Sequence, residues 1–159
     1  MLRSAPEMAL VSVFEEILVR AILFRIAEQA WGSRNALIAS TLFFVLAHLP
    51  GEGINLLGIA VTAVTAVGFA AADMDTRRLW LAIGLHFAWN FLFDGVFSVA
   101  VSGHAAKGWI QGSLIGPTWL SGGNYGVEAS VVAPLAWGLA SAALLRVARR
   151  RGQFLSSRR

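Results

Sequence analysis

Six polar side chains occur where long apolar segments would not ordinarily tolerate them. They form three groups along the chain: Glu15, Glu16 and Arg20, then His48, then His86 and Asn90. Ionisable side chains inside a membrane are energetically expensive and usually face a functional interior. Carboxylate, imidazole and carboxamide groups together can activate a water molecule, move a proton and stabilise an oxyanion. These residue types inside apolar segments therefore indicate chemistry inside a membrane.

The composition agrees with a membrane location. Hydrophobic residues make up 57% of the 159 residues and charged residues only 14%, and the mean hydropathy is strongly positive. A soluble domain of this size needs more polar surface than this chain has. We therefore expect an integral membrane protein with one helical bundle and no second domain of ordinary size. Because the chain has no cysteine, disulfides, thiolate catalysis and Cys-ligated zinc are excluded.

Five hydrophobic segments are visible, at residues 7–29, 35–48, 55–72, 79–101 and 129–147. Four of them approach the roughly 20 residues that cross a hydrocarbon core. The segment 35–48 stops early at Leu49-Pro50-Gly51, so its end is expected within the depth of the bilayer. A helix end there needs protein or water around its free carbonyls, which implies a cavity. The prediction is an all-α, polytopic transmembrane bundle of about five helices, forming a single domain over residues 1–159.

The basic residues predict the orientation. Six of the thirteen lie near the C-terminus: Arg146, Arg149, Arg150, Arg151, Arg158 and Arg159. A basic tail over residues 146–159, directly after an apolar segment, is typical of a cytoplasmic anchor facing anionic lipid headgroups, and nucleic acid is not an expected partner. Alternating the segments backward places the Arg-bearing connections 30–34 and 73–78 on the same side and leaves Arg3 and Lys107 outside. The Ala, Gly and Arg bias favours a bacterial source, so the predicted location is a bacterial inner membrane, and the basic tail predicts that the C-terminus is cytoplasmic.

Each polar group resembles a motif of one protein family. Glu15-Glu16-Ile-Leu-Val-Arg20 resembles the EExxxR motif of the CAAX protease and bacteriocin-processing family of intramembrane proteases, also called CPBP or Abi. Phe44-Val-Leu-Ala-His48 is similar to its FxxxH motif, and His86-Phe-Ala-Trp-Asn90 to its HxxxN motif. The resemblance extends over roughly residues 10–140. Family members usually have further helices before the first motif, so this chain is either N-terminally shortened or a minimal core.

The resemblance implies cleavage of a peptide bond close to the membrane, in a peptide or protein substrate that in some relatives carries a lipid. Glu15 is the candidate general base, because a carboxylate can take a proton from water and return it to the leaving amine. By resemblance, His48 helps to hold and polarise the same water. His86 and Asn90, one helical turn apart, can present two donors to an oxyanion.

Other charged residues are expected to have supporting roles. Glu16 and Arg20, at i and i+4, are predicted to form a buried ion pair that supports the site without taking part in the chemistry. Arg25 and Glu28 are predicted to be a solvated pair at the cytoplasmic boundary. Glu128 is predicted to favour the start of the last helix through the helix dipole.

A metal-dependent mechanism remains open at the level of sequence. Glu15, Glu16, His48 and His86 are acceptable zinc ligands, although the HExxH motif, which places two ligands and a base on one helix, is absent. The resemblance implies that a metal-free, glutamate-dependent mechanism has at least equal support. The favoured interpretation therefore requires no cofactor and keeps zinc as the alternative.

Two other classes of function are compatible with the sequence. A catalytically inactive member of the family would act as a membrane scaffold or bacteriocin-immunity protein through protein contacts. A proton-coupled transporter using Glu15 and Glu16 is disfavoured, because inverted repeats and helix pairs broken by Gly or Pro are not evident. An intramembrane endopeptidase is the favoured prediction.

Overall fold

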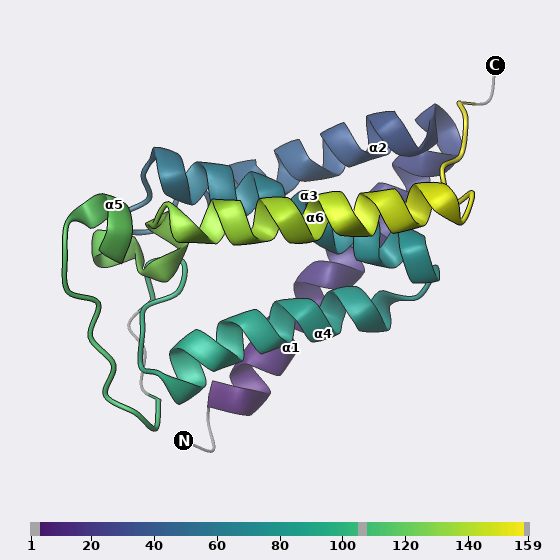
Figure 1. Cartoon of the computed structure of the whole chain (residues 1–159). Helices are drawn as coiled ribbons and strands as arrows, with labels where there is room; N and C mark the ends of the chain where they lie inside the picture. Colours follow the sequence, from purple (N-terminus) through teal and green to yellow (C-terminus); the bar gives the residue numbers. More distant parts are fainter. Residues whose placement is uncertain (1–3, 105–107, 158–159) are drawn as a thin grey trace.

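The computed structural model describes residues 4–104 and 108–157 (Figure 1). The main helices are α1 (Ser4–Glu16), α2 (Arg25–His48), α3 (Leu56–Thr76), α4 (Leu79–Asn90) and α6 (Val132–Arg150), with π-helical segments η1 (Ile17–Phe24) and η2 (Phe91–Val96) and the short elements α5 (Thr118–Ser121), η3 (Gly123–Tyr125) and η4 (Val127–Ala129). Within the described ranges every regular element is a helix and no β-strand forms, which confirms the predicted all-helical bundle. The basic residues Arg3, Lys107, Arg158 and Arg159 lie outside the described ranges.

The first turn of the chain is made at a single glycine. Helix runs without interruption from α1 through η1 into α2, and the predicted connection at 30–34 is reduced to Gly32, with φ 77° and ψ 166°. A side chain there would be strained by the positive φ, and its Cβ would lie 2.7 Å from the Ser157 backbone nitrogen. The predicted segment 79–101 is helical only as far as Val96.

Helix α3 occupies the centre of the bundle and packs against α2, α4, α6 and η1. Figure 1 shows α1 and α4 side by side in one layer and α2, α3 and α6 in the other. The layers meet near the turn between α3 and α4 and diverge toward the segment 97–131. The fold therefore holds the helices that carry the polar motifs at the junction of the two layers.

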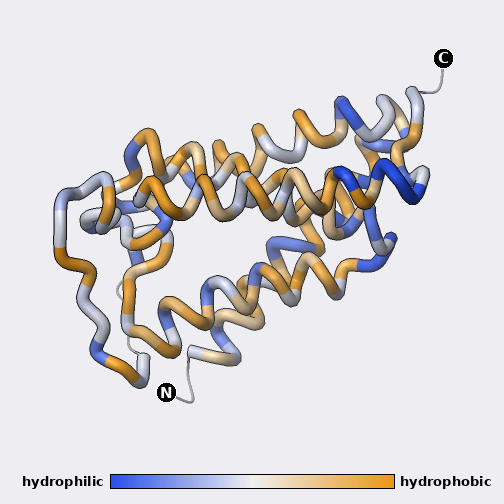
Figure 2. Tube along the Cα trace, viewed as in Figure 1, coloured by the Kyte–Doolittle hydropathy of each residue, from blue (hydrophilic) through white to orange (hydrophobic). Residues whose placement is uncertain are grey.

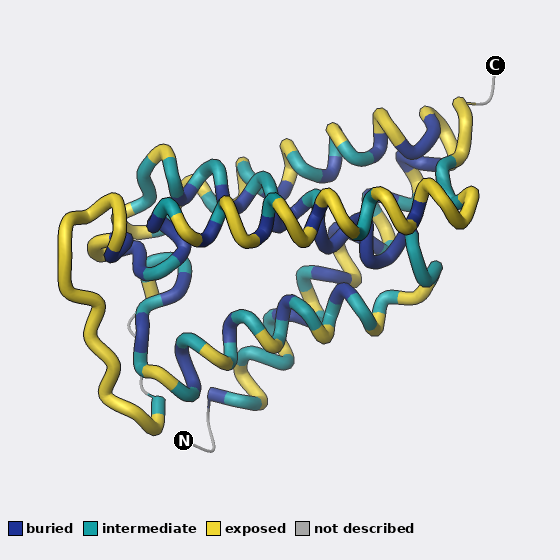
Figure 3. The backbone as a smooth tube through the Cα atoms, in the orientation of Figure 1, coloured by how far each residue is buried: buried dark blue, intermediate teal, exposed yellow. Residues whose placement is uncertain are grey.

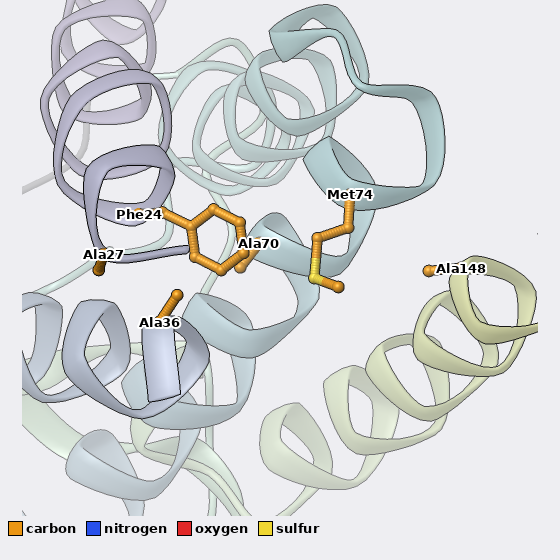
Figure 4. Packing of buried hydrophobic residues seen from close by; sticks show 6 residues of the cluster. All are labelled: Phe24, Ala27, Ala36, Ala70, Met74 and Ala148. Carbon is orange, nitrogen blue, oxygen red and sulfur yellow. The ribbon is translucent and has the colours of Figure 1, made fainter. Parts of the chain in front are cut away.

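Small side chains form much of the core. One cluster joins η1, α2, α3 and α6 (Figure 4): Phe24, Ala27, Ala36, Ala70, Met74 and Ala148. Alanines allow helix backbones to approach closely, as they commonly do in membrane bundles. Where α3 meets α6, the Ser141 hydroxyl donates a hydrogen bond of 2.8 Å to the Val64 carbonyl. The bundle is thus held by close backbone approach around α3.

The outer faces of the bundle are apolar. Helix α3, the run of α4 with η2, and α6 are each long and apolar enough to cross a membrane, by length and composition. Large hydrophobic side chains such as Leu10 and Leu139 remain more than two thirds exposed, and Figures 2 and 3 show apolar residues along the exposed sides of the helices. Exposed apolar surface of this extent is typical of a protein solvated by lipid.

Charged side chains near the turn between α3 and α4 form specific contacts that the sequence does not predict. The prediction of a solvated Arg25 and Glu28 pair is wrong, because these two side chains contact different partners. Arg25 pairs with the buried carboxylate of Asp73 at 2.7 Å, whereas Glu28 is itself buried and pairs with Arg77 at 2.5 Å. Arg77 also donates to the side chain of Gln153 at 2.9 Å. Both charges therefore join the helices to α3 and the turn after it instead of pairing with each other.

Candidate active site

Both carboxylates of the first motif lie in the last turn of α1, directly before η1. The second π-helical segment, η2, likewise begins directly after Asn90. A π-turn contains more residues than an α-turn, changes the direction of the side chains that follow, and often occurs at functional sites. Sequence analysis did not predict these segments, because one or two widened turns leave the hydrophobic pattern almost unchanged.

Three of the predicted site residues come together from three helices. The Glu15 Oε2 atom lies 4.0 Å from His48 Nε2 and 3.9 Å from His86 Nε2. Each gap is too long for a direct hydrogen bond but is within reach of one bridging water. Glu15 Oε2 is buried and has no hydrogen-bond partner in the protein. The arrangement can therefore hold a water molecule between one carboxylate and two imidazoles.

Hydrogen bonds on the far side of each ring fix its orientation. His48 Nδ1 lies 2.8 Å from the Phe44 carbonyl, and since a carbonyl only accepts, Nδ1 carries the hydrogen. His86 Nδ1 lies 2.9 Å from Glu16 Oε1, and it donates to that carboxylate for the same reason. Both imidazoles consequently turn Nε2 toward Glu15, and in a neutral ring this nitrogen is a hydrogen-bond acceptor.

Glu16 and Arg20 form an ion pair of 3.2 Å, and both side chains are completely buried. Arg20 also donates to the Ala66 carbonyl at 3.1 Å. Its guanidinium group lies over the rings of Phe44 at 4.6 Å and Phe69 at 5.4 Å. Attraction between a cation and an aromatic face is strongest where water is excluded, so these rings help to fix the buried charge.

The same two rings also contact the imidazoles. Phe69 stacks on His86 with a centroid distance of 4.8 Å, and Phe44 packs against His48 at 4.3 Å. Each phenylalanine therefore contacts both the buried arginine and a candidate catalytic ring. The FxxxH pattern placed Phe44 at this position, but nothing in the sequence pointed to Phe69.

A cavity of about 1100 Å³ adjoins the site. Its lining includes four predicted site residues: Glu15, His48, His86 and Asn90. The ion pair of Glu16 and Arg20 lies outside its wall. Further lining comes from the start of α1, the turn after His48, and the segment 97–131. The wall thus combines the predicted polar residues with parts of the chain that carry no recognisable motif.

Glu128 belongs to that unpredicted part of the wall. The prediction that it favours the start of the last helix is not what the structure shows, because α6 begins at Val132. The Glu128 carboxylate is buried and accepts a 2.8 Å hydrogen bond from Trp89 Nε1 and bonds of 2.8 and 2.6 Å from the Ser102 backbone N–H and hydroxyl. It therefore fastens the segment 97–131 to α4, one residue before Asn90.

The donor set is chemically suited to zinc, but its spacing is not. Ligand atoms around a tetrahedral zinc ion lie roughly 3.3 Å apart, whereas Glu15 Oε2 is 3.9 and 4.0 Å from the two imidazole nitrogens. No group of three or more His, Asp or Glu side chains in the described part of the chain has metal-ligand spacing. We therefore derive no catalytic step through a metal.

An all-helical bundle with apolar outer faces and a Glu/His/Asn cavity defines a candidate hydrolase of the membrane. Comparison with family models identifies the family: the model described as type II CAAX prenyl endopeptidase, Rce1-like, matches residues 3–92. This match covers more than half of the chain, and the chain belongs to this family of CAAX-type proteases. Together with the apolar helices, it identifies an integral membrane protein. Comparisons with curated proteins and with solved structures found no match.

Proposed function

We propose that this protein is an intramembrane endopeptidase that cleaves a peptide bond near the membrane with a water molecule held by Glu15 and His48, beside His86. One observation carries the proposal: a carboxylate oxygen and two imidazole nitrogens, from α1, α2 and α4, face one another across 3.9 and 4.0 Å in a cavity wall. Membership in a protease family supports the same class of reaction.

Two acceptor atoms in the cavity wall can orient and activate the water. The water donates its two hydrogens to Glu15 Oε2 and His48 Nε2, which turns an oxygen lone pair toward the substrate carbonyl carbon. As the new C–O bond forms, Glu15 takes one proton from the water. The C–N bond then breaks, Glu15 returns this proton to the amine nitrogen, and the products are a carboxylic acid and an amine.

The developing oxyanion needs hydrogen-bond donors placed in advance. We assign this role to Asn90, through its carboxamide N–H, and to His86. His86 donates from Nε2 only when both ring nitrogens carry hydrogen, because Nδ1–H is already bonded to Glu16. The carboxylates of Glu15 and Glu16 lie 3.9 Å from Nε2 and 2.9 Å from Nδ1 of this ring. Glu16 and Arg20 act as supporting residues, since they do not line the cavity.

The substrate in this proposal is a membrane-bound peptide or protein with an attached lipid chain. Apolar side chains of α1, η1 and α2, including Phe14, Leu18 and Phe43, both line the cavity and remain exposed on the outer surface. Such a wall is continuous with the lipid-facing surface, so an alkyl or prenyl chain can lie against it while the peptide reaches Glu15.

The orientation proposed for the chain has the C-terminus in the cytoplasm of a bacterial inner membrane. Its support is the charge distribution. Arg25, Arg77 and Arg151 form ion pairs around the α3–α4 turn and the end of α6, and Arg149 and Arg150 lie in the last turn of α6. Positive charge of this kind is retained on the cytoplasmic side of a membrane.

Replacement of Glu15 by Gln tests the proposed function. Glu15→Gln keeps the shape of the side chain but removes the base, so we expect at least a 1000-fold fall in kcat on a membrane-associated peptide, given typical general-base and preorganisation effects. Glu52→Gln is the matched control, because Glu52 is exposed and lies outside the cavity wall. It makes the same change of charge and should leave kcat unchanged.

The same pair of variants distinguishes the alternatives. A scaffold or immunity protein would keep its phenotype with Glu15→Gln, and persistent hydrolysis by this variant would contradict the assignment of the base. Elemental analysis of the purified protein and assay after chelation address the metal-dependent alternative. Loss of hydrolysis on chelation, restored by zinc, would overturn the metal-free mechanism.

A further inference from the structure

Tyr125 places an unpaired hydrogen-bond donor in the wall of the cavity. Its side chain is fully buried, it lines the cavity that Glu15 also lines, and its hydroxyl has no hydrogen-bond partner in the protein. A buried hydroxyl without a partner costs about 1–3 kcal/mol. A donor in this condition in a cavity wall can take a bound ligand as its partner.

The ring of Tyr125 is held in a defined position. A Cβ atom at Gly51 would lie 3.3 Å from this ring, and one at Gly58 would lie 3.1 Å from it. The ring therefore sits between the turn that follows His48 and the first turn of α3. Its backbone carbonyl also accepts a 3.1 Å hydrogen bond from Gly103 N–H. Because the ring is wedged on two sides, the hydroxyl is fixed relative to His48 and cannot swing away to find another partner.

Neighbouring hydroxyl groups leave Tyr125 as the available donor. Thr62 donates to the Gly58 carbonyl at 2.8 Å, and Ser102 donates to Glu128 at 2.6 Å. Both hydroxyls are close to that of Tyr125 without forming a hydrogen bond of ordinary geometry with it. Burial, and after it the nearby carboxylate of Glu128, raise the pKa of Tyr125, so the phenol keeps its hydrogen at neutral pH.

The charge of the cavity restricts which acceptor fits. Three further carboxylates, those of Glu7, Asp94 and Glu128, line the cavity besides Glu15, and no Lys or Arg is present among its described lining residues. An anionic group on a ligand would be repelled there, whereas a neutral carbonyl oxygen would not. The acceptor of matching chemistry is an amide carbonyl, which a peptide substrate supplies at every residue.

We propose that Tyr125 is a substrate-binding residue whose phenolic O–H donates a hydrogen bond to one backbone carbonyl of the bound peptide. The inference rests on the proposed endopeptidase function and gives the peptide a second fixed contact besides the water site at Glu15. Two fixed contacts set which peptide bond lies over the water. The charge of the wall makes this contact selective for a peptide carbonyl over a free terminal carboxylate.

Removal of the hydroxyl alone tests the contact. Tyr125→Phe should lower kcat/KM about tenfold, the usual loss for one hydrogen bond to substrate, while the melting temperature should not fall, because no hydrogen bond within the protein is lost and an unpaired buried hydroxyl is removed. Thr41→Val is the matched control: the Thr41 hydroxyl is also buried and unpaired but lies outside this cavity. It should leave kcat/KM unchanged, with a melting temperature no lower than that of the wild type. Wild-type kcat/KM in Tyr125→Phe, or a fall in stability that parallels the fall in activity, would overturn the proposal.

Binding measurements separate this inference from the proposed function. In the non-hydrolysing Glu15→Gln background, adding Tyr125→Phe should weaken peptide binding about tenfold. A series of peptides with one carbonyl at a time replaced by methylene should contain one member that binds the single and double variants equally. A constant ratio across the whole series contradicts the contact. Absence of hydrolysis by the wild type, with binding that still depends on Tyr125, would contradict the endopeptidase assignment alone. The same binding assay tests the selectivity for a neutral carbonyl over a carboxylate. Wild-type protein that prefers the carboxylate would overturn this selectivity. Lys107→Gln and Arg3→Gln measure whether basic residues outside the described ranges contribute to the preference.

Discussion

Adjacent carboxylates at the end of α1 have different surroundings. Successive side chains of a helix point about 100° apart, so Glu15 faces the cavity while Glu16 faces the core. Glu16 joins two groups there: one oxygen accepts from His86 and the other pairs with Arg20. The sequence predicted an ion pair for Glu16 but not its contact with His86, because i, i+4 spacing identifies neighbours on one helix and not partners on another.

Either member of the buried pair of Glu16 and Arg20 should destabilise the protein when it is left without its partner. Glu16→Gln leaves the buried guanidinium of Arg20 without its carboxylate, and Arg20→Met leaves Glu16 with His86 as its remaining partner. Removing one member of a buried pair costs about 3–5 kcal/mol, whereas removing both costs less than the sum. We expect thermal unfolding in detergent to show both single variants strongly destabilised and the double variant less so than the two effects added.

Arg34→Gln is the control for these variants, because Arg34 is exposed on α2 and its loss should change stability little. Additive effects of the two buried substitutions would mean that Glu16 and Arg20 are stabilised by separate neighbours. In that case Phe44 and Phe69, together with the Ala66 carbonyl, would hold Arg20 without help from the carboxylate.

At the scale of elements, the bend at Gly32 depends on residues distant in sequence. Ser33 N–H donates to the Leu155 carbonyl at 3.0 Å, and Leu155 N–H donates to the Ser33 hydroxyl at 2.8 Å. The chain that follows α6 therefore lies against the bend and satisfies backbone groups that a broken helix leaves free. A bend between two helices is fixed here by a third segment.

Gly32→Ala should destabilise the bundle at this point. A methyl group there meets the backbone of residues 155–157 and imposes strain at a φ of 77°, which costs on the order of 1–3 kcal/mol. Gly138→Ala is the matched control, since Gly138 lies within α6 and a Cβ there meets nothing within 4 Å. The control should be neutral or slightly stabilising, because alanine favours helix. A melting temperature for Gly32→Ala equal to that of Gly138→Ala would contradict the role of the bend.

The helices could be predicted from the sequence where a run of apolar residues is long. The bundle and the positions of its main helices follow from runs of apolar residues, and polar residues within them pointed to Glu15, His48 and His86, which the structure brings together. Their catalytic roles stay predictions. Tyr125 and Glu128 were not identifiable as wall residues, because a Gly- and Ser-rich segment has no periodicity that says which side chains turn inward.

At the scale of the whole molecule, charge and cavity occupy opposite ends. Ion pairs of Arg25, Arg77 and Arg151 gather around the α3–α4 turn and the end of α6, and Figure 2 shows this end as the most hydrophilic. The cavity is lined by the turn after α2 and by the segment 97–131, which Figure 1 shows at the other end. If the basic end is cytoplasmic, a peptide outside the lipid enters the cavity from the opposite side of the membrane.

Single cysteines can determine this orientation, because the chain contains none of its own. Ser113 in the segment 97–131 and Ser156 after α6 are both exposed, so Ser113→Cys and Ser156→Cys should fold normally. A membrane-impermeant maleimide applied to intact cells should label Ser113→Cys, whereas Ser156→Cys should react only after the membrane is opened. The reverse pattern would place the basic end outside. The cavity would then open toward the cytoplasm, and a peptide bond in a cytoplasmic, membrane-attached protein would become the accessible target.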